Sequence, residues 1–113
     1  MSAPIFATHF AAAPPEVRER LEHIAAEVEC RVPSATRCIG YQMPAFRLAR
    51  IFFYFAAFKK HIGIYPPVHG PVDLLTRLAP YRGPKGNLMF PHSKPLPIAL
   101  IGAVAERLAD QYK

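Results

Sequence analysis

Two adjoining β-prone segments constrain the fold of this chain more than any other feature. Residues 50–58 contain the run Ile51-Phe52-Phe53-Tyr54-Phe55, and residues 61–65 read His-Ile-Gly-Ile-Tyr. β-Branched and aromatic residues favour strands. Only Lys59 and Lys60 separate the two segments, and Pro66-Pro67 ends the second. The sequence therefore predicts an antiparallel hairpin with a short loop.

The even length of that loop predicts which side chains share a face of the hairpin. A loop of two or four residues places Phe58 opposite His61, Ala56 opposite Gly63 and Tyr54 opposite Tyr65. Side chains alternate along a strand, so these six residues lie on one face. The other face is purely apolar and is expected to pack under helices; its members are Phe53, Phe55, Ala57, Ile62 and Ile64.

The rest of the chain supplies helices on either side of this hairpin. Pro14-Pro15 opens the first helix, since proline suits a first helical turn. Its apolar stripe is Val17, Leu21, Ile24, Ala25 and Val28. Residues 35–43 favour one strand that Pro44 ends, and residues 87–90 another. A short helix is expected between Pro71 and Pro80. A last helix carries Ile101, Val104, Ala105, Leu108 and Tyr112.

This order of elements predicts an α+β fold in two layers, a mostly antiparallel sheet covered on one face by helices. At 113 residues, with 51% hydrophobic and 19% charged residues, the chain fits a single domain over residues 1–113. Residues 1–13 are expected to form an N-terminal tail. No apolar run reaches membrane-spanning length and no signal peptide is evident, so we expect a cytoplasmic protein without a membrane partner.

The charge and the cysteines set limits on partners and chemistry. The net charge of +6 permits an anionic partner, although it also suits a domain that is merely soluble. Two cysteines, Cys30 and Cys38, do not make a disulfide framework and are expected to be reduced thiols. No nucleophile elbow, phosphate-binding loop or zinc-protease motif occurs in the sequence.

Three stretches together resemble a known family. They are Gly40–Phe46 (GYQMPAF), Tyr54–Pro66 (YFAAFKKHIGIYP), and Lys85-Gly86 with Phe90-Pro91 and the KPLP at 94–97. The chain is similar over most of its length to the YdhG-like bacterial domain of unknown function. That resemblance implies the order α-β(3)-α-β(2)-α. The chain departs from the family pattern at Arg47-Leu48-Ala49-Arg50, which lacks the usual Gly or Asn of a polar turn.

The preferred interpretation is a non-enzymatic binding module that takes a small anionic ligand or a partner peptide in a groove. Aromatic rings with polar tips and small residues between them are typical of such a surface. His61 is the strongest single candidate, and its pKa is expected to be lowered by the neighbouring lysines. The groove is expected to be lined by Tyr41, Met43, Phe46, Tyr54, Phe58, His61 and Tyr65, with Lys59 and Lys85 at its rim.

Two alternatives come from other classes of function. The resemblance raises iron delivery, because one family member is a frataxin-like intracellular iron chaperone; the acidic candidates here are Glu19 and Glu22 with His23. No other cofactor is expected. The second alternative is nucleic-acid binding, through Lys59, Lys60, Arg82, Lys85 and Lys94 beside Tyr54, Tyr65 and Phe90. Whether the chain is a monomer or a homodimer is left open.

Overall fold

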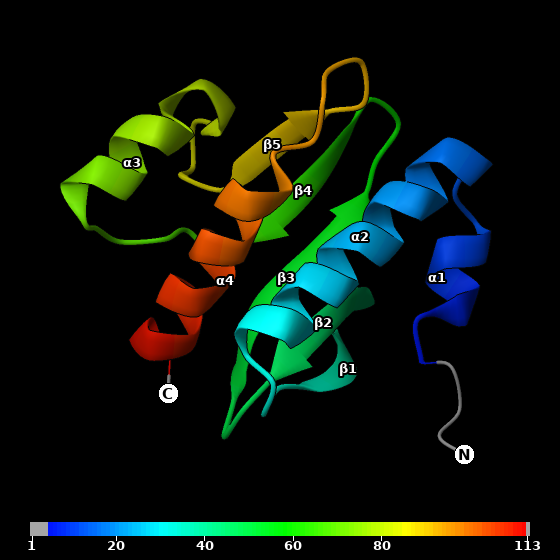
Figure 1. Cartoon of the computed structure of the whole chain (residues 1–113). Helices are drawn as coiled ribbons and strands as arrows, with labels where there is room; N and C mark the ends of the chain where they lie inside the picture. Colours follow the sequence, from blue (N-terminus) through cyan, green and yellow to red (C-terminus); the bar gives the residue numbers. More distant parts are fainter. Residues whose placement is uncertain (1–4, 113) are drawn as a thin grey trace.

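The computed structural model describes residues 5–112 as a five-stranded sheet with helices packed on one face (Figure 1). Every strand pairs antiparallel with the next along the chain, in the order β1-β2-β3-β4-β5. This confirms the predicted α+β class. The elements are α1 (Ala7–Ala11), α2 (Pro15–Arg31), β1 (Thr36–Gly40), β2 (Met43–Arg47), β3 (Ile51–Ala57), β4 (His61–Tyr65), α3 (Val72–Leu78), the 3₁₀ turn η1 (Ala79–Tyr81), β5 (Leu88–Pro91) and α4 (Ile98–Gln111).

The helical layer is built on the two long helices, α2 and α4, which pack on each other and on β3 (Figure 1). The stripe predicted on α2 is buried in full. On α4 the residues Ile101, Val104, Ala105 and Leu108 are likewise buried. Helix α3 packs on α4 and helix α1 on α2, so these short helices extend the layer on its two sides. Among residues 5–112 no helix is long and apolar enough to cross a membrane.

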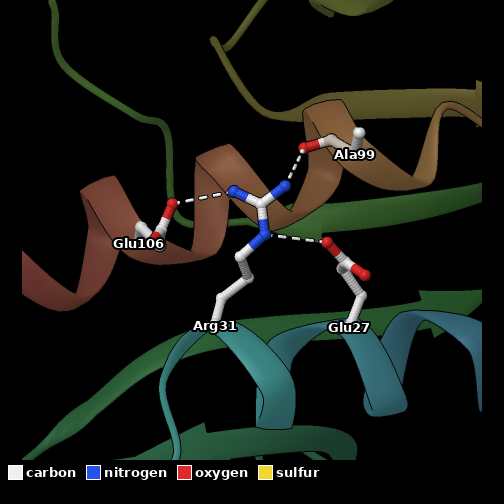
Figure 2. Close-up of polar contacts among 4 residues, drawn as sticks. All are labelled: Glu27, Arg31, Ala99 and Glu106. Atoms are coloured by element: carbon white, nitrogen blue, oxygen red, sulfur yellow. Dashed lines mark hydrogen bonds and ion pairs between the residues drawn. The ribbon is translucent and has the colours of Figure 1, made fainter.

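Arg31 joins the last turn of α2 to α4 (Figure 2). Its guanidinium donates from Nε to Glu27 Oε2 at 2.8 Å, from Nη1 to Glu106 Oε1 at 2.9 Å and from Nη2 to the carbonyl of Ala99 at 3.3 Å. The two helices come close here because α4 has glycine at position 102. A Cβ on Gly102 would lie 2.6 Å from Glu27 Oε2 and 2.9 Å from Arg31 Nε.

A β-bulge in β3 adds one large side chain to the core. Phe53 pairs with Phe46 and Ile51 pairs with Arg47, which leaves Phe52 as an extra residue. Two consecutive residues, Phe52 and Phe53, are therefore fully buried in the helix-covered core. Ile51 stays on the opposite face, where its Cδ1 approaches Gly40.

The order of strands expected from the resemblance holds in outline and differs in detail. Four strands precede α3 and one follows it, where three and two were expected. The single strand predicted over residues 35–43 is instead part of a hairpin, because Tyr41 and Gln42 form a two-residue turn between β1 and β2. Pro44 does not end a strand but is the second residue of β2. Near Tyr81 the chain forms only η1 and an isolated bridge between Arg82 and Leu88.

The expectation that residues 1–13 form a tail is wrong from Ile5 onward; residues 1–4 lie outside the described part. Phe6 is 1% exposed, and its ring meets the rings of Phe10, Phe46 and Phe55 at centroid distances of 5.4–5.6 Å. The segment is short, but its two phenylalanines complete the core beside β2 and β3. The Arg37 guanidinium covers the Phe6 ring at 4.9 Å from its centroid.

Candidate functional site

The hairpin of β3 and β4 has the pairing predicted from its loop length. Tyr54 lies opposite Tyr65 and Ala56 opposite Gly63. The loop is the two-residue Lys59-Lys60, closed by the amide of Phe58 donating to the carbonyl of His61 at 2.7 Å. Four residues of the apolar face, Phe53, Phe55, Ile62 and Ile64, are fully buried under the helices. The sheet therefore leaves its other face without a helical cover.

Five rings gather on that uncovered side, and we call Tyr41, Tyr54, Phe58, His61 and Tyr65 the aromatic face. Phe58 stacks on His61, with ring centroids 5.1 Å apart and planes 27° apart. Tyr41 lies 5.6 Å from Tyr54, centroid to centroid. Two glycines of the sheet leave room for these rings. A Cβ on Gly63 would sit 3.0 Å from both Phe58 Cε2 and Tyr65 Oη, and one on Gly40 only 2.8 Å from Tyr54 Cε2.

The turn that presents Tyr41 is held in a strained backbone conformation. Tyr41 has φ 51° and Gln42 has φ 62°, the left-handed region that L-residues other than Gly, Asn and Asp rarely adopt. A type I′ hairpin turn needs this conformation at both central positions, so such turns favour Asn-Gly. The result here is a tyrosine that is 84% exposed at the edge of the sheet. Strain of this kind persists where the surrounding structure holds it, and it is concentrated at functional sites.

A cavity of about 1090 Å³ opens at the end of the sheet beside this turn, and we call it the end cavity. Its walls come from five segments: α1 with its link to α2, the first turns of α2, the β1–β2 turn, the end of β3 and the loop after β5. Four residues predicted for the groove line it, namely Tyr41, Met43, Phe58 and Lys59. The remaining wall is largely apolar and includes Val17, Leu21, Pro44 and Ala57.

Two histidines that sequence reasoning did not place at the site also line the end cavity. His9 Nε2 lies 3.0 Å from the carbonyl oxygen of Gln42, and His92 Nε2 lies 2.8 Å from that of Phe58. A carbonyl only accepts, so each Nε2 carries hydrogen and donates. In the neutral ring Nδ1 is then an acceptor. Both Nδ1 atoms are buried and have no hydrogen-bond partner among the described protein atoms.

The other predicted residues lie elsewhere. Tyr54, His61 and Tyr65 are half-buried on the aromatic face, next to the end cavity but not in its wall. Lys85 is exposed in the turn before β5 and does not line the cavity. The inclusion of Phe46 was wrong: it pairs with Phe53 across the bulge, points into the core and is fully buried. Phe90, expected beside the basic residues, is also a core residue at 1% exposure.

The electrostatics of the aromatic face follow mainly from burial. Burial, and then the neighbouring His92, lowers the pKa of His61 below its ordinary value of 6.5. The predicted direction was right and the predicted cause, the adjoining lysines, was wrong. Burial also raises the pKa of Tyr54, with Tyr41 as the next cause. The pKa of Cys38 is raised by burial against an opposing effect of Arg47.

The acidic candidates for iron do not converge. Glu19, Glu22 and His23 are all exposed on α2. Within residues 5–112 no group of three or more His, Cys, Asp or Glu side chains is arranged to hold a metal ion. Two other acids of α2 are occupied by arginines, Glu27 by Arg31 and Glu29 by Arg37. Cys30 and Cys38 are not bonded to each other.

Comparison with known proteins identifies solved structures of similar fold. No protein-family model matches the sequence, and neither does any curated protein. A crystal structure of YdhG, a DUF1801 family protein from Bacillus subtilis, superposes with a TM-score of 0.72 at 20% identity, covering 94% of this chain and 86% of that one. The chain has a YdhG-like fold. An uncharacterized conserved protein from Lactobacillus casei matches with a TM-score of 0.51 at 23% identity, over 93% and 89% of the two chains.

These matches confirm the resemblance predicted from the three motifs, and at such identities they establish the YdhG-like fold alone. Neither matched structure is described by an activity or a ligand. Any function of this chain must therefore be argued from its own residues.

Proposed function

We propose that this YdhG-like protein is a non-enzymatic binding module, and that the end cavity takes a small ligand with an apolar body and an anionic head. The observation that carries the proposal is the composition of the cavity. Its volume is close to the upper end for small-molecule sites, its walls are mainly apolar, and a few polar groups lie among them. Four of its residues were expected at the site from the sequence.

The charged groups of the wall bear on the head group of the ligand. Lys59 is exposed in the wall and supplies the positive charge for the head group, while Glu16 lies in the same wall with the opposite charge. The predicted preference for an anion therefore rests on Lys59 prevailing over Glu16.

Binding rather than catalysis is supported by the state of the reactive groups nearest to the site. Burial raises the pKa of Cys38, which disfavours the nucleophilic thiolate. Both cavity histidines use one ring nitrogen to hold a backbone carbonyl, His9 at the β1–β2 turn and His92 at the end of β3. That bond fixes each ring in place, as suits a binding wall.

The experiment uses 8-anilinonaphthalene-1-sulfonate, which has an apolar body and an anionic head, as a fluorescent probe, with octanoate and octanol as competitors. We expect one saturable site, displaced more strongly by octanoate than by octanol. Lys59→Gln should weaken probe binding by about two- to fivefold, the effect of an exposed ion pair. Lys60→Gln is the matched control, since Lys60 adjoins Lys59 but does not line the cavity.

A second pair of variants tests the location. Ala12→Trp places a large ring at an exposed position in the cavity wall and should abolish probe binding. Ala7→Trp makes the same change on α1 at an exposed position outside the wall and should leave binding intact. Equal loss in Lys59→Gln and Lys60→Gln, or full binding by Ala12→Trp, would contradict the proposal.

A further inference from the structure

Charge is divided between the two layers of the molecule. All eight acidic residues lie on helices: five on α2, Asp73 on α3, and Glu106 and Asp110 on α4. The segments 32–71 and 79–97, which form the sheet and its connections, carry eight of the fourteen Lys and Arg residues and no acid. The net charge of +6 is therefore concentrated on the sheet side, and the helical layer carries all of the acidic residues.

The basic residues of the sheet side are available to a partner. In residues 5–112 the ion pairs involve Arg31, Arg37 and Arg107, and only Arg37 among these belongs to the sheet. Seven further basic side chains of the sheet and its connections are exposed and make no ion pair with a described residue. They are Arg47, Arg50, Lys59, Lys60, Arg82, Lys85 and Lys94.

The rings of the aromatic face lie between the basic ends of the hairpin. Arg47 and Arg50 flank the β2–β3 turn, and Lys59 and Lys60 form the β3–β4 turn at the other end of β3. The six residue steps of β3 span about 20 Å. The Tyr54–Tyr65 pair lies in the middle of β3, and the Phe58–His61 stack lies four residues further along, one residue past the end of β3 and roughly 13 Å away at the same rise.

From this arrangement we infer that the aromatic face binds single-stranded nucleic acid. The RNA-recognition motif binds RNA in this way, by stacking two or three bases on aromatic side chains of an open four-stranded sheet. Base stacking with flanking cations is also how sequence-tolerant single-strand binding works. Two separated ring pairs match two or three bases, and the cations at both ends of β3 match the phosphates on either side. A duplex fits less well, because its bases are stacked on each other and hide their faces.

This surface is distinct from the end cavity, although Tyr41 and Phe58 border both. The two inferences make different demands on the same lysine pair. The end cavity uses Lys59 and not Lys60, whereas a phosphate backbone crossing the β3–β4 turn uses both. The variants Lys59→Gln and Lys60→Gln therefore separate failure of one inference from failure of the other.

The test is fluorescence anisotropy of a labelled 12-nucleotide oligo-dT against the full chain, with a 12-base-pair duplex and polyglutamate as comparison ligands. We expect the single strand to bind more tightly than either. The slope of log K against log salt should be about −2 to −3, the value for three or four phosphate contacts. The Arg50→Gln/Lys60→Gln variant should reduce that slope by about 1.4, and Arg77→Gln on α3 should not change it.

Stacking is tested separately from charge. Tyr65→Leu keeps an apolar side chain but removes the ring, and should weaken oligo-dT binding roughly 5- to 150-fold, the range for losing one stacked base. Tyr65→Phe should restore binding. Thermal unfolding of each variant checks that it is folded, and the exposed Arg50 and Lys60 variants keep the test decisive if Tyr65→Leu does not fold. Equal or tighter binding to the duplex or to polyglutamate would overturn the inference, as would unchanged binding by folded Tyr65→Leu.

Discussion

Phe58 stacks on His61 across the last pair of the β3–β4 hairpin, with their ring centroids 5.1 Å apart. Phe58 also lines the end cavity, and its carbonyl accepts a hydrogen bond from His92 at 2.8 Å. This pair is thus the border between the cavity and the aromatic face. A change in His61 should be felt on both sides of it.

The pH dependence of stability should report on His61. Because burial lowers the pKa of His61 in the folded state, the unfolded chain binds the proton more readily. The stabilising contribution of neutral His61 is therefore complete above about pH 6.5, the unfolded value, and is lost as pH falls through the folded pKa. Urea unfolding from pH 8 to pH 5 should show a smaller loss of stability for His61→Gln than for the wild type. Parallel curves for the two proteins would contradict this account.

The N-terminal helix should contribute a large part of the stability of the core. Phe6 is 1% exposed and packs among three other phenylalanines, so Phe6→Ala should cost about 3–5 kcal/mol in the free energy of unfolding. Ile5→Ala is the matched control, because Ile5 is 40% exposed; it should cost less than about 0.5 kcal/mol. A small effect of Phe6→Ala in urea unfolding would mean that the segment is a tail after all.

The β1–β2 turn should be stabilised by glycine. A left-handed conformation costs an L-residue about 1–2 kcal/mol, and glycine avoids this cost. Part of the gain is lost because glycine raises the conformational entropy of the unfolded chain. Gln42→Gly should therefore raise the free energy of unfolding by about 0.5–1 kcal/mol by these two terms. The same change at Arg50, in the β2–β3 turn, should destabilise, since its φ is not positive. Thermal unfolding of both variants measures the difference.

The strained β1–β2 turn should affect ligand binding through the ring of Tyr41 that it presents, not through the strain itself. Gln42→Gly should keep binding of the anilinonaphthalene probe. Tyr41→Ala should weaken it, because Tyr41 lines the end cavity. Unchanged probe affinity in Tyr41→Ala would show that the turn matters only for folding.

The hairpin was predictable because its loop is short and its two faces differ in chemistry. Loop parity alone placed Tyr54 opposite Tyr65 and separated buried Ile62 and Ile64 from the aromatic face. The same reasoning failed at β2, because a proline such as Pro44 usually indicates the end of a strand. A turn of two non-glycine residues with positive φ has no clear sequence signal, so the β1–β2 hairpin was missed.

The site was only partly predictable because its walls come from segments far apart in the chain. Phe46 was misplaced because β2 was missed: alternation within β2 puts Phe46 on the opposite face from Ala45, where it pairs with buried Phe53. His9 was overlooked because its segment has only a short apolar pattern, Phe6 and Phe10. That i, i+4 pair was the one available signal of a helix that packs.

Mapping of the bound anion most directly tests the claim that the end cavity is a ligand site. In two-dimensional ¹H–¹⁵N NMR spectra of the full chain, titration with octanoate should shift amides that line the cavity from distant segments, including Val17, Gln42 and Ala57. Those shifts should saturate together with one dissociation constant and should be absent in Ala12→Trp. Unsaturable shifts scattered over exposed lysines, or saturable shifts that persist in Ala12→Trp, would contradict it.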